Sequence, residues 1–333
     1  MNKKTVSYVI PCYNEAAVLP EFYRRIRAVA DTRVDYEFEF VFINDGSRDE
    51  TPRLLNEIAD QDSRAKVLHF ARNMGHQEAI TAGMDFSSGD IIVTIDADLQ
   101  DPPELIDEIL EEMAQGYDVI HMQRRKRPGE SRFKLASSSA FYWLMKHVGN
   151  AHIVANSGDF RAFTRPVLEA MRQFREKHRF MRGLFAMIGF RQTTLQYDRD
   201  RRFAGQTKYP LRKMLRLASN AILSFSATPL HTIIWLSMLL WLASLIYLIK
   251  ALVDHFLLEI TVQGWTSIII LMTFYTGIIL FCLSIIATYI GRIFEQGQHR
   301  PLYWLYDARN IDLREFSGVS RETRISSNIL DSK

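Results

Sequence analysis

Cysteine is scarce in this sequence, and the glycine-rich loops that commonly bind phosphates are missing. Only Cys12 and Cys282 occur among the 333 residues, far apart and in segments of very different composition. This argues against a disulfide framework and favours a reducing compartment. Neither G-x-G-x-x-G nor G-x-x-x-x-G-K-S/T occurs, which excludes the usual glycine loops for dinucleotides and nucleoside triphosphates. If the chain binds phosphates, a metal ion must therefore make more of the contacts with them.

An excess of charge of one sign is also missing. The chain has 41 Lys and Arg against 38 Asp and Glu, a formal net charge of +3. That balance gives no reason by itself to expect a nucleic-acid partner, and we predict none. The first stretch, "MNKKTVSYVIPCYNE", lacks the length and the small-residue cleavage site of a signal peptide. We therefore expect the start of the chain to stay in the cytoplasm.

Two long apolar runs lie toward the C-terminal end. They extend from Leu230 to Val253 and from Trp265 to Ile290, and each exceeds the roughly 20 residues that cross a bilayer core. Lys and Arg flank the pair on its outer sides, whereas the connecting loop has Asp254 and Glu259. This asymmetry predicts a two-helix transmembrane hairpin with both ends in the cytoplasm. The alternative is a buried helix of a soluble core, but two such runs so close together argue against it.

The composition divides the chain into four segments. Residues 1–209 form the predicted cytoplasmic domain, and 210–229 form a juxtamembrane amphipathic helix. Residues 230–291 hold the two transmembrane helices, and 292–333 form a cytoplasmic C-terminal tail. The tail is polar and long enough to dock on a neighbouring molecule or to remain disordered.

The first 125 residues alternate β-rich runs with amphipathic stretches. The runs "TVSYVI", "EFEFVFI", "KVLHFA", "DIIVTI" and "YDVIHM" are separated by segments with helical spacing, as in βαβ units. We therefore predict an α/β fold with a doubly wound, mostly parallel sheet. Ligands of such sheets collect at the carboxyl ends of the strands, and the polar clusters "PCYNE", "NDGS", "ARNMG" and "DADLQ" follow four of these runs. One binding site is implied at that edge.

Two carboxylates one residue apart follow the run "DIIVTI". A turn at this strand end can direct both Asp96 and Asp98 toward a divalent cation, with Gln100 as a third oxygen ligand. Oxygen ligands suit Mg²⁺ or Mn²⁺, which recruit substrate phosphates, so a diphosphate is the expected partner. The alternative is a solvated acidic turn with helix-capping Asp residues. Asp101 is expected to be such a cap.

Two basic stretches have the character of membrane-surface helices. The segment "QRRKRPGESRFK", which contains Arg124 and Arg132, continues into aromatic and apolar residues, and "PLRKMLRLASNAILSF" precedes the first apolar run. A solvated basic face is the alternative for either stretch. Because both lie near the predicted membrane domain, they are candidates to receive a lipid phosphate, for which Arg offers bidentate contacts.

Several motifs occur in a fixed order: "VIPCYNE", "INDGS", "ARNMGHQEAITAG", "DADLQDPPE", "SGDFRAF", "RFMRG", "YDRDRRFAGQTKYP", the two apolar runs, and "YIGRIF". This set resembles the bacterial polyprenyl-phosphate glycosyltransferases of family 2, especially the bactoprenol glucosyltransferases, and more distantly the dolichol-phosphate mannose synthases. The resemblance implies a GT-A (Rossmann-like) catalytic domain, an inverting mechanism and a nucleotide-diphosphate sugar as donor. It also implies a homo-oligomer, since relatives suggest a tetramer.

The resemblance assigns site residues by their match to the family motifs. Asn44 stands where many relatives have Asp, which keeps an acceptor oxygen but loses the charge. Asp159 in "SGDFRAF" matches the proposed catalytic base, although from the residues alone it could equally be a turn acid paired with Arg161. The other implied positions are Pro11, Tyr13, Glu15, Asp45 and Asp96 for the nucleotide, Asp96, Asp98 and Gln100 for Mg²⁺ or Mn²⁺, Arg124 and Arg132 for the lipid phosphate, and Arg202 and Lys208 for closure over the pyrophosphate.

The predicted activity is transfer of a hexose, with glucose from UDP-glucose as the first choice, to undecaprenyl phosphate. It would take place at the cytoplasmic face of the bacterial inner (plasma) membrane and serve cell-envelope or O-antigen (lipopolysaccharide) modification. Alternatives are the same reaction with GDP-mannose, a UDP-N-acetylhexosamine or a UDP-aminoarabinose derivative. Others are an inactive membrane-anchored nucleotide-sugar sensor and a metal phosphohydrolase. A processive polysaccharide synthase is disfavoured, since Q-x-x-R-W is missing.

Overall fold

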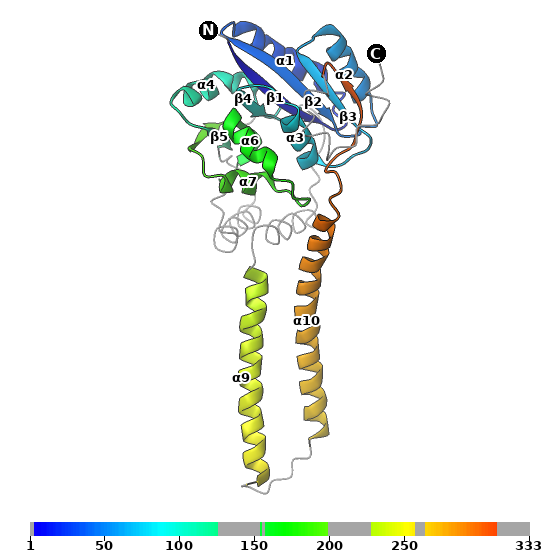
Figure 1. Cartoon of the computed structure of the whole chain (residues 1–333), viewed down its shortest axis with the longest axis vertical. Coiled ribbons are helices and arrows are strands. Elements are labelled where there is room, and N and C mark those ends of the chain that lie inside the picture. Colours follow the sequence, from blue (N-terminus) through cyan, green and yellow to red (C-terminus); the bar gives the residue numbers. More distant parts are fainter. Residues whose placement is uncertain (1–2, 126–153, 155–156, 199–227, 257–263, 312–333) are drawn as a thin grey trace.

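An α/β domain carries two long helices that extend from it side by side (Figure 1). The computed structural model describes residues 3–125, 154, 157–198, 228–256 and 264–311. The strands are β1 (Lys4–Cys12), β2 (Tyr36–Asn44), β3 (Ala65–Phe70), β4 (Ile91–Thr94), β5 (Val119–Arg124), β6 (Ser157–Thr164), β7 (Gln192–Tyr197) and β8 (Leu305–Arg309). The helices are α1 (Leu19–Thr32), α2 (Thr51–Gln61), α3 (His76–Asp85), the 3₁₀ turn η1 (Pro103–Leu105), α4 (Ile106–Ala114), α6 (Arg165–Gln173), α7 (Met181–Met187), α9 (Thr228–Phe256) and α10 (Trp265–Gly297).

The strands form one sheet in the order β7-β5-β6-β4-β1-β2-β3-β8. Neighbours from β4 to β3 are parallel, whereas β6 runs antiparallel to β4 and β5, and β8 runs antiparallel to β3. The five predicted strand runs are present as β1 to β5, and the predicted mostly parallel α/β fold is confirmed. Strands β6, β7 and β8 were not among the predicted strands.

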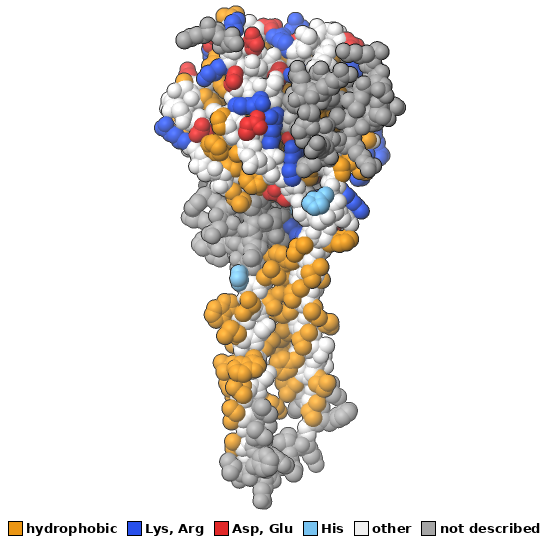
Figure 2. Space-filling model, viewed as in Figure 1, with side chains coloured by type: hydrophobic (Ala, Val, Ile, Leu, Met, Phe, Trp, Pro, Cys, Tyr) orange, Lys and Arg blue, Asp and Glu red, His pale blue; other side chains and the backbone are white. Residues whose placement is uncertain are grey.

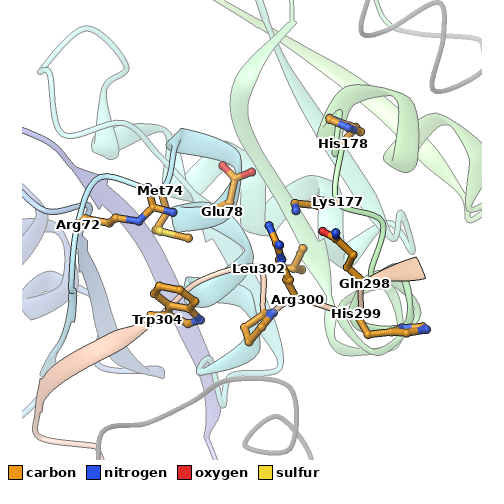
Figure 3. A pocket seen from close by; sticks show the side chains of 11 residues that line it. Arg72, Met74, Glu78, Lys177, His178, Gln298, His299, Arg300, Leu302 and Trp304 are labelled. Atoms are coloured by element: carbon orange, nitrogen blue, oxygen red, sulfur yellow. The ribbon is translucent and has the colours of Figure 1, made fainter. Parts of the chain in front are cut away.

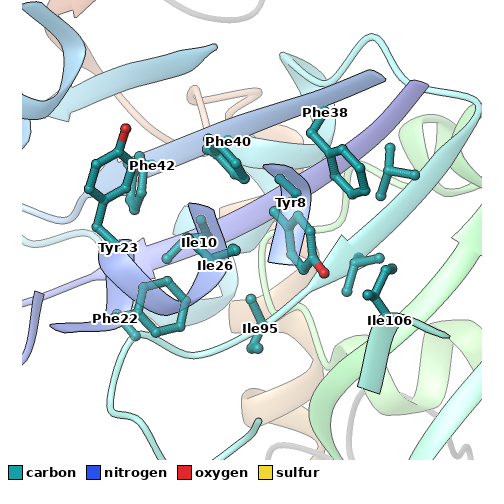
Figure 4. Packing of buried hydrophobic residues seen from close by; sticks show 14 of the residues in the cluster. Tyr8, Ile10, Phe22, Tyr23, Ile26, Phe38, Phe40, Phe42, Ile95 and Ile106 are labelled. Carbon is teal, nitrogen blue, oxygen red and sulfur yellow. The ribbon is translucent and has the colours of Figure 1, made fainter. Parts of the chain in front are cut away.

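The central strands are apolar almost without interruption because both faces of the sheet are covered. In β1, Tyr8 and Ile10 face the layer of α1, α2 and α4, whereas Val9 between them faces the layer of α3, α6 and α7. Figure 4 shows Tyr8 and Ile10 packed with Phe22 and Ile26 of α1. The two cores fix the sheet between two helical layers, so the carboxyl ends of the strands remain the place for a site.

Helix α3 lies unusually close to the sheet. A Cβ at Gly83 would come within 2.3 Å of Val9 Cγ1 and 2.7 Å of Ile43 Cδ1, so only glycine permits this approach. The helix begins after Gly75, whose φ of +126° is strained for any residue with a side chain. Together these glycines place the N-terminus of α3, and with it His76, over the end of the sheet.

Helices α9 and α10 contain the two apolar runs and are long and apolar enough to cross a membrane. Their large side chains are exposed to solvent along the length of the hairpin, as Figure 2 shows in orange, and Trp235 is 72% exposed. Exposed apolar surface of this extent marks a surface that is covered in the working protein. One contact between the helices is the hydrogen bond of 2.9 Å between the hydroxyls of Ser244 and Tyr275.

The chain beyond α10 returns to the α/β domain. Strand β8 pairs with β3, and the backbone N–H of Ala71 donates to the carbonyl of Trp304. Residues 298–311 therefore belong to the sheet domain, although they were predicted to form part of a C-terminal tail. The predicted juxtamembrane helix at 210–229 lies almost wholly outside the described residues, as does the rest of the tail from 312.

Candidate active site

The site residues come from two neighbouring strands that run in opposite directions. Thr94 at the end of β4 is paired with Arg161 of β6. Two residues further along the chain from Thr94 is Asp96, and two residues before Arg161 is Asp159, so the antiparallel register brings these two carboxylates to the same place. The hydroxyl of Thr94 donates to the backbone carbonyl of Asp159 and holds this register at its end.

His76 lies between the two carboxylates. Its Nε2 is 3.1 Å from Asp159 Oδ2 and 3.6 Å from Asp96 Oδ1. The side chain of His76 is 43% exposed, that of Asp96 is 29% exposed and that of Asp159 is 12% exposed. The cluster therefore opens to solvent on the side of His76 and is closed on the side of Asp159.

The charges in this cluster shift one another's pKa values. Burial alone would lower the pKa of His76, but Asp96 and Asp159 outweigh it and raise that pKa to about 9. Burial also raises the pKa of Asp96 to about 6, with help from the carboxylates of Asp101, Asp159 and Asp98. For Asp159, burial is outweighed by His76 and neighbouring arginines, and its pKa lies far below the usual range. At neutral pH the cluster is an imidazolium between two carboxylates.

A second set of side chains holds Asp159 in place. Gln77 donates from Nε2 to Asp159 Oδ2 at 3.4 Å while its Oε1 accepts the backbone N–H of Met181. Arg182 Nε lies 3.5 Å from Asp159 Oδ1. Arg161, which the sequence alone made a possible partner of Asp159, instead donates to the carbonyl of Gly158 and stacks over Phe185 at 4.3 Å. Asp159 is thus anchored from α3 and from the start of α7.

Asp98 and Gln100 lie in the tight turn after β4. Asp98 Oδ1 accepts the backbone N–H of Gln100 at 3.1 Å, and Leu99 between them has a φ of +58°, which is uncommon for a residue with a side chain. The carboxylates of Asp101, Asp159 and Asp98 surround Asp96 with negative charge. Among the described residues, no three His, Cys, Asp or Glu side chains are arranged to hold a metal ion. The donor set fits a cation held by one or two carboxylates, with substrate phosphates and waters as its other ligands, as is usual for Mg²⁺.

The residues predicted to bind the nucleotide follow β1 and β2. Pro11 lies within β1, Tyr13 just beyond it is 45% exposed, and the backbone N–H of Glu15 donates to Thr51 Oγ1. Asp45 is 3% exposed, and its carboxylate accepts the backbone N–H groups of Met74 and Gly75. In this structure Asp45 ties the loop before α3 to β2, so Tyr13 is the more accessible surface for a base.

Asn44, the position that departs from the family pattern, has a structural explanation. Its Oδ1 accepts the backbone N–H of Ser47, and its Nδ2 lies 3.0 Å from His69 Nδ1. Because the other ring nitrogen of His69 faces Asn56 Oδ1, the Nδ1 of a neutral His69 is free to accept from the amide of Asn44. Burial lowers the pKa of His69 and so favours this neutral form. An aspartate could not donate to that nitrogen.

The prediction that Asp101 is a helix cap is wrong. The helical turns after it have no side-chain cap, and Asp101 is fully buried. Its carboxylate accepts a hydrogen bond from Tyr197 and lies 3.3 Å from Arg124 Nη2. Arg124, predicted to bind a lipid phosphate, is therefore held at the end of β5 by a buried acid. The other predicted phosphate ligands, Arg132, Arg202 and Lys208, lie outside the described residues.

His76, Gln77 and Arg182 belong to the candidate site but were not among the predicted site residues. The signal was present, because "GHQE" follows a strand end and begins a helix, and Arg182 lies in the motif "RFMRG". The pairing of β4 with β6, which brings Asp159 close to Asp96, could not be predicted from the sequence. Without that pairing, the contact of His76 with Asp159 could not be predicted either.

Comparison with known proteins gives consistent results. The family model for glycosyl transferase family 2 matches residues 7–172. The uncharacterized glycosyltransferase YkcC of Bacillus subtilis (strain 168) is 42% identical over 92% of this chain and 94% of its own length. The bactoprenol glucosyl transferase of Shigella phage SfV is 35% identical over 90% of this chain and 97% of its own length. Among solved structures, mannosyl-3-phosphoglycerate synthase from Rubrobacter xylanophilus superposes with a TM-score of 0.44. It is 19% identical over 66% of this chain and 72% of its own, and this likeness is too distant to inform the site.

Proposed function

The chain belongs to glycosyltransferase family 2, and from that premise we propose that it transfers glucose from a nucleotide-diphosphate donor to a polyprenyl phosphate. Relatives that share about a third of its residues over nearly their whole length are named bactoprenol glucosyl transferases. We propose UDP-glucose as the donor, undecaprenyl phosphate as the acceptor and the bacterial inner membrane as the place of reaction. The catalytic domain would lie on the cytoplasmic side, with α9 and α10 as two spans.

The observation that carries the proposal is the cluster of Asp96, His76 and Asp159 at the carboxyl edge of the sheet. A donor diphosphate bound beside Asp96 and Asp98 would place the anomeric carbon of its sugar within reach of the Asp159 side of the cluster. When bound, a divalent cation, Mg²⁺ or Mn²⁺, neutralises charge on the leaving diphosphate. Asp96 and Asp98 would hold it, with Gln100 as a further oxygen donor.

In the proposed reaction, an oxygen of the lipid phosphate attacks the anomeric carbon in line. The bond from that carbon to the diphosphate oxygen breaks, UDP leaves and the configuration inverts. If the attacking phosphate still carries a proton, Asp159 accepts it at Oδ1. This oxygen is buried and has no hydrogen-bond donor among the described residues, with Arg182 Nε at 3.5 Å. His76 and Gln77 occupy Oδ2, so Oδ1 is the carboxylate oxygen that we assign to the proton.

The acceptor must reach this edge from the membrane. Arg124 at the end of β5 is the described residue that we assign to its phosphate, since Arg binds phosphate bidentately. Because Asp101 and Tyr197 already orient its guanidinium, Arg124 would lose little conformational freedom on binding. Arg132, Arg202 and Lys208 are proposed to complete the phosphate contacts, and a homo-oligomer is proposed as the working form.

The experiment that tests the function is a donor panel. The purified full chain is supplied with polyprenyl phosphate, Mg²⁺ or Mn²⁺ and one radiolabelled nucleotide sugar at a time, and lipid-linked sugar is measured. We expect product with UDP-glucose and release of UDP in equal amount. Product with a different donor would show that another sugar is transferred in the same type of reaction. Release of free sugar or phosphate without lipid product would indicate a hydrolase, and no turnover with any donor would indicate a binding protein.

A further inference from the structure

A pocket lies where α10 meets the α/β domain. Its walls come from residues 72–78 at the start of α3, residues 177–178 before α7, and residues 298–304 after α10, and its volume is about 670 Å³. That volume is within the range of ordinary small-molecule sites. None of His76, Asp96 and Asp159 lines it, so it is separate from the candidate active site.

The pocket is strongly basic. Arg72, Lys177 and Arg300 line it together with two histidines, whereas Glu78 is the one acid among its lining residues. Figure 3 shows Arg72 on one side of the space and Lys177 and Arg300 on the other. Within the described part of the chain, none of these three cations forms an ion pair with a carboxylate, whereas the lining residue His178 contacts Glu295. Three cations without a carboxylate partner around one space are expected to attract an anion.

A buried arginine adds to this positive charge. Arg179 follows Lys177 and His178 in the chain and is 8% exposed, and none of its three guanidinium nitrogens has a hydrogen-bond partner among the described residues. Asp85 is one of the acids near it, but Arg175 and Tyr303 already bind that carboxylate. The positive charge of Arg179, which directly follows a lining residue in the chain, is therefore only partly neutralised.

The position of the pocket suits a membrane lipid. The apolar window of α10 extends to Gly297, and the lining residues begin directly after it. On the last turns of α10, Ile293 is 70% exposed and Phe294 is 66% exposed. Trp304 is 41% exposed at the rim, with the guanidinium of Arg72 over its ring at 5.8 Å. Tryptophan is enriched at the depth of lipid headgroups, and basic residues beside a span attract anionic lipids.

We propose that this pocket binds the phosphate of an anionic phospholipid headgroup from the leaflet that contacts the α/β domain. Arg72, Lys177 and Arg300 hold the phosphate, while Trp304 and Leu302 contact the glycerol region. The proposal depends on α9 and α10 crossing the membrane and does not depend on the sugar-transfer reaction. Since residues 177–182 connect the pocket to Arg182 beside Asp159, a bound headgroup also fixes the segment that anchors the active site.

The test measures lipid retention by the full chain. Wild type and the triple variant Arg72→Gln, Lys177→Gln and Arg300→Gln are placed in phosphatidylcholine nanodiscs with and without phosphatidylglycerol, and retained lipid is measured by native mass spectrometry. Each cation near an anionic surface contributes about a factor of five in affinity, so the triple variant is expected to bind phosphatidylglycerol about 100-fold more weakly. Arg300→Glu alone, a change at an exposed side chain, gives a second measurement if the triple variant does not fold.

The matched control removes the same charge far from the membrane. Arg24, Arg27 and Arg53 are exposed on α1 and α2, at the opposite end of the domain from the hairpin (Figure 1). Their replacement by Gln is expected to leave phosphatidylglycerol retention at the wild-type level. Loss of retention in the control as well would mean that net charge alone governs binding, and the proposal would fail.

Two further outcomes would overturn the assignment. If soluble glycerol phosphate binds the wild type as tightly as phosphatidylglycerol does, and the triple variant loses it, the pocket takes a free phosphate. If the triple variant retains phosphatidylglycerol but dissociates an oligomer that the control preserves, the pocket is an interface between copies of this chain. Selective loss of lipid retention in the triple variant and in Arg300→Glu supports the headgroup site.

Discussion

Replacing Asp159 by Asn isolates the charge of the carboxylate that faces the proposed reaction. Asn keeps the size and one acceptor oxygen but removes the negative charge that His76 and Arg182 face. The residues after β1 that are proposed to bind the nucleotide are unchanged, so we expect UDP to bind as it does to wild type. General-base catalysis contributes roughly 10²- to 10⁴-fold, which sets the scale of the expected loss in turnover.

The pH dependence distinguishes a base from an anchor. The second pKa of a phosphate monoester is near 6, so about half of the acceptor retains a proton at pH about 6 and about one part in a hundred at pH about 8. A base acts only on the protonated fraction. We therefore expect Asp159→Asn to recover part of its deficit as the pH rises across this range. The pKa of Asp159 lies far below the range, so its own titration does not produce the change.

The assay follows lipid-linked product from radiolabelled donor across this pH range. Asp107→Asn is the control, because that carboxylate is 54% exposed in an ion pair with Arg33 and should leave turnover unchanged. The same profiles in a His76→Asn background separate the titration of the phosphate from that of the imidazole, whose pKa of about 9 depends on Asp159. A deficit that stays constant with pH would refute the base role and favour positioning, and wild-type turnover would remove Asp159 from the mechanism.

Three further predictions concern the metal, the topology and the fold. Turnover requires a divalent cation and is abolished in Asp98→Ala, because the leaving diphosphate loses its counter-charge, and robust turnover in excess chelator would contradict this. We expect a cysteine introduced at position 259 to be labelled only from the side of the membrane opposite the termini. Labelling from the cytoplasmic side alone would mean that the hairpin has the opposite topology. Asp85→Ala removes a fully buried carboxylate bound by Arg175, so we expect it to lower the free energy of unfolding by about 3 kcal/mol in a denaturant titration. In the same titration, the control Asp107→Ala changes the free energy of unfolding by at most about 0.5 kcal/mol.

The sequence predicted those elements whose signal is local. Strands β1 to β5 were identified because burial on both faces gives a short apolar run that can be recognised without knowing its neighbours. The same holds for α9 and α10, whose length and composition are sufficient to identify them. Asp96 could be placed at the edge of the sheet because it directly follows such a run.

The carboxyl-edge location was predicted, but the composition of the site depends on pairing between distant segments. Asp101 was taken for a cap because Asp before Pro is a common helix start, yet it is buried against Arg124 and Tyr197, two residues far along the chain. Asn44 was predicted to keep an acceptor oxygen but to lose a charge, whereas the structure shows that its amide nitrogen also contacts His69 on β3. Neither partner could be read from the sequence around Asp101 or Asn44.

By itself, therefore, the sequence determined an α/β domain with a polar edge, two membrane-length helices and a family resemblance carried by ordered motifs. The tertiary structure decided that β6 runs antiparallel beside β4, which sets Asp159 opposite Asp96 and gives His76 two carboxylate partners. It also decided that the chain returns after α10 to add β8 to the sheet and to form the basic pocket with residues from α3 and the segment before α7. The physical reason is that strand register and pocket walls depend on contacts between residues many positions apart, whereas periodicity and hydrophobic length are properties of a single segment.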